Sequence, residues 1–206
     1  GLDNDQRLIN YFRWINKSDL EKLYSTNLRR QLKNINPEKP MLDFISEISN
    51  NESNIDKMLA LEQRFFLSDH NLNYTDKMSM KLGVEVRVPF LDNQLVEFAD
   101  TIPYYFKQRG RIGKWIFKKA MEPYLPRKII YRPKTGFGLP LRKWIKVDLK
   151  DWISETLSYE KIKSRGLFDP KNVIQLIKDN ENNKIDASYT IFSLACIEIW
   201  CQYYID

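Results

Sequence analysis

The chain has 206 residues, of which 43% are hydrophobic and 13% aromatic, so it holds enough apolar material for a folded core and is not expected to be disordered. No apolar run approaches the ~20 residues of a membrane-spanning helix. The opening residues, Gly1 to Arg7, are polar and charged rather than signal-like. The sequence therefore predicts a cytoplasmic protein with no membrane partner.

The balance of charge is positive, with 33 Lys and Arg against 27 Asp and Glu, a net charge of +6 and a pI near 9.1. A basic surface attracts anions such as ATP, pyrophosphate or nucleic acid, although an excess of solvated lysines gives the same total. Basic residues form a modest cluster from Lys107 to Lys119. No zinc finger or RNA-binding signature accompanies it, so no nucleic-acid partner is expected.

The two cysteines and the single histidine argue against a disulfide, a metal site and a catalytic pair that contains histidine. Cys196 and Cys201 lie five residues apart in an expected helix, about 140° apart around its axis, which argues against a disulfide. Buried free thiols are expected instead. With His70 as the only histidine, the sequence predicts no metal site and does not support a catalytic His–Ser or His–Cys pair.

Most of the first hundred residues show helical spacing of apolar side chains. Helices are expected over 19–32 and 56–68, with an Asn- and Pro-rich loop at 34–40 between them. The β-branched run 84–90 is limited to an edge or a loop by Pro89. Asp92 can cap a helix over 93–99, with Leu91 and Val96 placed as a hydrophobic staple.

Further helices are expected in the second half of the chain, over 113–121, 147–157, 170–178 and 187–204. Asp169 and Pro170 form a cap and a first-turn proline, and Asp186 can cap the last helix. This last helix is apolar on nearly every side, which predicts a buried central position. Its one charge, Glu198, then needs a partner, for which Arg132 or Arg142 is the expectation. An alternating strand and helix pattern is absent, so the fold class is mainly α.

Two motifs carry the most information about function. In the stretch from Arg132 to Pro140, two glycines and two prolines shape a loop whose cations can reach a phosphate. Upstream lies Glu-Val-Arg-Val-Pro-Phe-Leu-Asp over 85–92. Asp-Lys-Met-Ser-Met at 76–80 precedes this run. The other motifs, in chain order, are Tyr-Leu-Pro at 124–126, Trp144, Ser-Leu at 193–194 and Glu-Ile-Trp at 198–200. Together they resemble the synthetase domain of the asparagine synthetase family from about Met58 to the C-terminus.

The resemblance implies the helical C-terminal part of an adenine-nucleotide alpha-hydrolase-like (ATP pyrophosphatase) synthetase domain. The nucleotide-binding α/β half with its Ser-Gly-Gly-Leu-Asp-Ser-Ser-type loop is missing, as is the glutaminase domain with its nucleophilic cysteine. Residues 1–55 are expected to be a helical segment linking to the missing half, and 56–206 the family-like helical region. A truncated gene product and half of a split enzyme both remain open.

In the family, ATP with Mg²⁺ adenylates the side-chain carboxylate of aspartate, pyrophosphate leaves, and glutamine-derived ammonia attacks the acyl carbon. Lys134 matches the loop lysine that contacts phosphates, and an exposed loop lysine is the alternative. Arg132 is a candidate for the same contact, unless it instead pairs with Glu198 or caps a helix. The resemblance also allows a homodimer.

Three further residues are candidate contacts to ATP or substrate. Glu85 and Arg87 share a face if the chain is extended. They either contact substrate or nucleotide near the cleft, or form a buried ion pair that holds the turn after Val88. Asp76 could orient a loop or bind a cation, but a structural hydrogen bond is favoured. Met78 and Met80 are expected in the core. Lys77 stands where the family often has Arg, which puts a bidentate contact there in doubt.

The resemblance therefore predicts part of an asparagine synthetase, a carbon–nitrogen ligase, that is inactive as this chain alone. A non-catalytic helical module for binding or assembly is the main alternative. A family member that amidates another carboxylate or closes a β-lactam-type ring is the other.

Overall fold

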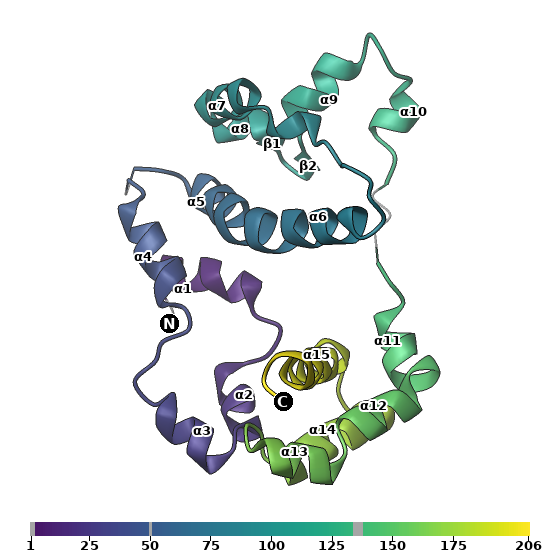
Figure 1. Cartoon of the computed structure of the whole chain (residues 1–206). Coiled ribbons are helices and arrows are strands. Elements are labelled where there is room, and N and C mark those ends of the chain that lie inside the picture. The colour runs from purple at the N-terminus through teal and green to yellow at the C-terminus, as the bar shows by residue number, and fades with distance from the viewer. Residues whose placement is uncertain (1–2, 50, 134–137) are drawn as a thin grey trace. The chain divides into compact units, whose positions relative to one another are not determined.

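The computed structural model describes residues 3–49, 51–133 and 138–206, and these are mainly helical as expected (Figure 1). They form two compact units. The first consists of 1–9 and 38–135, and the second of 10–37 and 136–206. None of the three boundaries falls at residue 55, so the division of the sequence there stays a prediction about family organisation.

The first unit begins with a small helical cluster. It contains α1 Asn4–Ile9, α4 Lys39–Glu47, α5 Asn54–Leu61, the π-helical stretch η2 Glu62–Leu72 and α6 Asn73–Met80. Figure 1 shows α5, η2 and α6 running on as one long helix. Ile9, Ile45 and Leu61 are the buried centre of this cluster, where α1, α4 and α5 meet. The expected helix over 56–68 is thus confirmed, and it is longer than its apolar spacing indicated.

The rest of the first unit consists of short elements. They are η3 Pro89–Leu91, α7 Asn93–Thr101, α8 Tyr104–Lys107, β1 Gln108–Arg109, β2 Ile112–Gly113, α9 Trp115–Met121 and α10 Arg127–Ile130. Asp92 caps α7 as predicted, accepting the Leu95 N–H at 3.2 Å. β1 and β2 form an antiparallel hairpin that the sequence analysis did not predict. Residues 84–88 have no regular secondary structure.

The second unit is built from two distant stretches of chain. The N-terminal stretch supplies η1 Asn10–Phe12, α2 Lys17–Leu23 and α3 Thr26–Gln31. The C-terminal stretch supplies α11 Leu141–Lys143, η4 Trp144–Asp148, α12 Lys150–Thr156, α13 Tyr159–Arg165, α14 Pro170–Glu181 and α15 Ser188–Tyr204. One apolar core joins them. Its buried members are Leu23, Leu141, Ile145, Ile153, Leu157, Ile162, Val173, Ala187, Ile191, Leu194 and Ala195.

The single helix predicted over 19–32 is wrong, because α2 ends at Leu23 and α3 starts at Thr26. Tyr24 is extended and forms an antiparallel bridge with Phe168, and the Ser25 N–H donates to Leu167 O at 2.9 Å. The Ser25 side chain then caps α3 by accepting the Leu28 N–H. A pairing with residues far along the chain thus overrides the local helical spacing.

α15 was expected to be buried all round, and only one of its faces is buried. Ile191, Leu194 and Ala195 lie in the core, whereas Trp200 and Tyr203 are 54% and 79% exposed. Cys201 is a buried free thiol as expected, but Cys196 is exposed, which corrects the expectation for that residue. Apolar side chains all round a helix therefore do not require burial all round.

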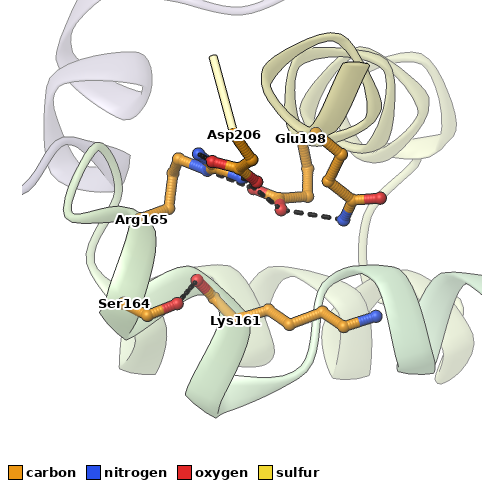
Figure 2. Close-up of polar contacts among 6 residues, drawn as sticks. Lys161, Ser164, Arg165, Glu198 and Asp206 are labelled. Atoms are coloured by element: carbon orange, nitrogen blue, oxygen red, sulfur yellow. Dashed lines mark hydrogen bonds and ion pairs between the residues drawn. The ribbon is translucent and has the colours of Figure 1, made fainter. Parts of the chain in front are cut away.

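The partner of Glu198 is neither Arg132 nor Arg142 but Arg165, at the end of α13. Arg165 donates Nε and Nη2 to the Glu198 carboxylate at 3.0 and 3.1 Å, and Nη1 and Nη2 to the Asp206 carboxylate at 2.7 Å (Figure 2). Gln202 Nε2 donates to Glu198 at 2.9 Å. Arg142 instead pairs with Asp186, whose Oδ1 also accepts the Ser188 N–H at 3.3 Å.

Candidate functional site

Four of the five site residues expected from the sequence lie in the described part of the first unit, and the fifth, Lys134, lies outside the described residues. Asp76 is on α6, Glu85 and Arg87 are in the irregular stretch after it, and Arg132 follows α10. All four side chains are exposed. They are thus accessible to a ligand and are not part of a core.

The structure brings only Glu85 and Arg87 together, as an ion pair with Arg87 Nη2 2.6 Å from Glu85 Oε1. The pairing agrees with two side chains on one face of an extended segment. The pair is not buried, because the two side chains are 68% and 83% exposed. In this chain the pair is therefore an exposed ion pair, and both groups are open to solvent.

Asp76 and Arg132 have no side-chain hydrogen bond or ion pair to other residues in the described ranges, so the structural hydrogen bond favoured for Asp76 is not present there. The hydrogen bond at this position uses the Asp76 backbone oxygen, which accepts from Ser79 Oγ at 3.0 Å. Met78 and Met80, expected in the core, are 62% and 54% exposed. α6 therefore offers both polar and apolar groups that the described residues leave uncovered.

Sequence reasoning missed a polar cluster directly before the Arg132 loop. Glu122 Oε1 accepts from the Tyr131 hydroxyl at 2.7 Å, from Lys119 Nζ at 2.9 Å and from Arg127 Nη1 at 3.4 Å. Hydrogen bonds from Lys119 and then Tyr131 lower the pKa of Glu122, and the same Glu122 contact raises the pKa of Tyr131. The cluster ties the end of α9 to the end of α10, so it fixes the backbone that leads into Arg132.

A signal for this cluster was present in the sequence as an asymmetry of charge. Glu122 is the single acid between Asp100 and Asp148, a stretch with thirteen Lys and Arg residues. Subtracting these from the 33 cations and 27 acids of the whole chain leaves 20 and 26, so the rest of the protein is acidic. The basic residues are therefore concentrated between Asp100 and Asp148. This stretch is longer and more basic than the modest cluster expected at 107–119.

The described residues of the site include cations suited to phosphate oxygens. Arg87 and Arg132 are exposed guanidinium groups, which match phosphate geometry. Over residues 3–49, 51–133 and 138–206, no group of three His, Cys, Asp or Glu side chains could hold a metal. No residue of the described chain is thus assigned to Mg²⁺. In the same ranges no helix is long and apolar enough to cross a membrane.

Comparison with known proteins identifies the family. The asparagine synthase family model matches residues 4–202, nearly the whole chain. This chain belongs to the asparagine synthase family. The match begins well before Met58, where the resemblance was expected to start, so the family-like region includes the N-terminal helices. No solved structure matched the chain significantly.

The relatives are named as glutamine-hydrolysing asparagine synthetases. Asparagine synthetase 1 of Bacillus subtilis is 29% identical over 87% of this chain, and asparagine synthetase 3 of the same organism is 30% identical over 80%. The nodule asparagine synthetase of Pisum sativum is 43% identical over 31% of the chain. The chain spans 29%, 26% and 12% of these proteins respectively.

Proposed function

We propose that this chain is a part of an ATP-dependent asparagine synthetase that acts in the cytoplasm. The family match over residues 4–202 carries the proposal. The proposed reaction adenylates the side-chain carboxylate of aspartate, releases pyrophosphate and forms the amide with ammonia derived from glutamine. The proposed partners are the rest of the synthetase domain and a glutaminase domain, with ATP and Mg²⁺ as in the family, and a homodimer is one arrangement of the assembled enzyme.

The role proposed for this chain is to supply cations and positioning groups. Lys134 is proposed as the catalytic residue that stabilises charge on the phosphates, and Arg132 as a second phosphate contact. Glu85, Arg87 and Asp76 are proposed as ATP or substrate contacts, which their exposure supports. Fixed charges of this kind act by stabilising the transition state without reorganising at the moment of reaction.

The chain alone is proposed to be inactive, since it spans under a third of the synthetases that it matches. The test is ATP–pyrophosphate exchange with aspartate, measured on the purified chain and on the chain mixed with a second polypeptide. That polypeptide is the part of Bacillus subtilis asparagine synthetase 1 that does not align with this chain. Exchange is expected only in the mixture, and only with aspartate.

Three other results would change the proposal. Aspartate-dependent exchange by the chain alone would contradict its inactivity. Exchange in the mixture with a different carboxylate would favour a family member that amidates another substrate. A mixture that forms a complex without any exchange would favour the non-catalytic module.

A further inference from the structure

The segment from Pro89 to Pro133, which contains η3 to α10, does not bury its own apolar side chains. None of its residues is buried, and neither is any residue over 62–88. Its short elements still hold together, since α8 packs on α9 and on β1, and Phe90 meets Phe117 edge to face at 5.4 Å. The 89–133 segment is thus a structured surface without a core of its own.

The uncovered side chains of the 89–133 segment are large and apolar. Phe98 is 62% exposed, Tyr124 76%, Ile129 49% and Leu125 42%. Scattered apolar residues on a surface are ordinary, but a stretch of this length in which no side chain is buried is not. Covering this surface requires another apolar surface.

Charge decides what kind of surface can cover it. Between Asp100 and Lys134 there are nine Lys and Arg residues and the single acid Glu122. Several of the cations are already used, because Lys119 and Arg127 contact Glu122, and Arg109 lies over the Trp115 ring at 5.0 Å. Arg111, Lys114 and Lys128 have no side-chain partner in the part of the chain that the structure describes. A partner surface therefore has to bring acidic groups.

A second copy of the chain fits this requirement poorly. A two-fold dimer through the 89–133 segment would place two strongly basic surfaces against each other, and like charges in an interface disfavour association. A nucleic acid would satisfy the cations but would not cover aliphatic side chains such as Leu125 and Ile129. An acidic polypeptide with an apolar centre satisfies both.

We infer that the 89–133 segment is the docking surface for the portion of the asparagine synthetase that this chain does not contain, and that the contacting surface of that portion is apolar at its centre and acidic at its rim. The inference rests on the proposed function for the identity of the partner. The length of the relatives supports it, because about 70% of Bacillus subtilis asparagine synthetase 1 lies outside the match. An apolar centre with a polar rim is the usual anatomy of a stable protein interface.

The test measures binding of the purified chain to the part of Bacillus subtilis asparagine synthetase 1 that does not align with it, by sedimentation velocity and by titration. A one-to-one complex is expected that weakens between 50 and 500 mM NaCl, since salt screens exposed charges. Ile129→Asp, at the apolar centre, is expected to raise the Kd by about tenfold or more, the usual effect of changing a central contact. Arg111→Glu places an acid against the acidic rim and is also expected to raise the Kd by about tenfold or more, because like charges repel across an interface. Far-UV circular dichroism and melting curves show that each variant is folded.

Matched changes on the second unit are the controls. Tyr203→Asp introduces the same charge at an exposed aromatic residue, and Lys163→Glu reverses an exposed cation. Both are expected to leave the Kd within about twofold. Absence of a complex overturns the inference, as does equal weakening by the control pair. Binding of the chain to an anionic vesicle of phosphatidylglycerol or to an oligonucleotide, lost in Arg111→Glu while no polypeptide complex forms, also overturns it.

Activity is read separately in the same mixtures. A complex that depends on Ile129 and Arg111 but makes no asparagine from aspartate, ATP and ammonia contradicts the proposed function and leaves the docking surface standing.

Discussion

At the scale of single residues, the carboxylate of Glu198 shows how a buried charge is accommodated in the second unit. Glu198 is 8% exposed and is the one charged side chain on α15. Arg165 donates to both of its oxygens and Gln202 donates to Oε1, so each carboxylate oxygen accepts at least one hydrogen bond. Removing one member of such a group leaves the others without their partner, which costs more than an exposed pair would.

Glu198→Gln is therefore expected to lower the free energy of unfolding by about 1.5–3 kcal/mol, the cost of losing a hydrogen-bonded charge. Glu155→Gln is the matched control, because Glu155 is 80% exposed and lies 3.8 Å from Lys161. Its change should be below about 0.5 kcal/mol. Urea titration of both variants measures the difference, and equal effects would show that the Glu198 pair contributes no more than a surface pair.

The same group makes the second unit sensitive to acid. Burial, the largest influence on Glu198, raises its pKa, but hydrogen bonds from Arg165 and Gln202 outweigh it, and the net pKa lies below the usual value. Arg165 also lowers the pKa of Asp206. Both carboxylates thus bind protons more readily when unfolded, so stability rises with pH through about pH 4 and is lost as the pH falls through the folded values.

We expect the stability of the chain to be nearly constant between about pH 5 and pH 8 and to fall below about pH 4. The stability of Glu198→Gln should fall less steeply over this range, because one of the carboxylates whose pKa is lowered on folding is gone. Urea midpoints measured from pH 3 to pH 6 test this. Parallel curves for the two proteins would contradict the role assigned to Glu198.

In the assembled enzyme, Lys134→Ala is expected to reduce turnover about 10²- to 10³-fold, the usual cost of losing one preorganised charge-stabilising group. Lys134→Arg should restore little, because a planar guanidinium does not replace a compact ammonium. Lys163→Ala, which removes an exposed cation on α13 of the second unit, is the control and should remain active. Steady-state kinetics and melting curves measure both effects. Near-normal turnover in Lys134→Ala would make this lysine an ordinary surface residue.

At the scale of elements, α15 stabilises the second unit through one buried face. Ile191 is fully buried and lies in the core with Leu194 and Ala195, whereas its neighbour Phe192 is 38% exposed. Ile191→Ala should cost about 2–5 kcal/mol, the range for a large-to-small change in a core. Phe192→Ala should cost clearly less although it removes more atoms. Chemical denaturation of the two variants tests this, and the opposite order would place the core on the other face.

Local signals in the sequence located helices wherever capping and spacing agreed. Asp169 caps α14 by accepting the Asn172 N–H at 3.0 Å, and Asp92 caps α7 in the same way. Such contacts span three residues, so the sequence contains all the information they need. The start of α15 differs, since Asn180 accepts the Ala187 N–H at 2.9 Å from the preceding helix, a contact that no local pattern indicates.

Long-range contacts explain what could not be predicted. The break at Tyr24 depends on Phe168, and the partner of Glu198 lies 33 residues before it in the chain. In the candidate site, the spacing of Glu85 and Arg87 was sufficient to predict that they share a face, but not their exposure. Exposure depends on which surfaces are covered, and sequence spacing contains no information about that.

At the scale of the whole molecule, the order of the two units along the chain is the main feature. Residues 38–135 of the first unit are inserted between the two stretches that build the second unit. The second unit closes through hydrogen bonds between those stretches: the Asp169 backbone N–H donates to Leu23 O at 2.7 Å, and the Asn172 side chain donates from Nδ2 to Lys22 O at 2.7 Å. Lys22 and Asn172 are 150 residues apart, so this unit depends on one of the longest separations the chain allows.

This separation has a consequence during translation. At about 5–20 residues per second, a ribosome needs roughly 7–30 s to make the residues between Ser25 and Asp169, and for that time Leu23 has no core to enter. The second unit should therefore fold only after its later helices have been made, and slowly, because distant contacts must be closed before they stabilise anything. Nascent chains stalled before Phe168 emerges should be cut readily by protease within 10–37, and chains stalled after Asp206 has left the tunnel should resist. Equal resistance at both lengths would mean that this stretch finds an earlier partner.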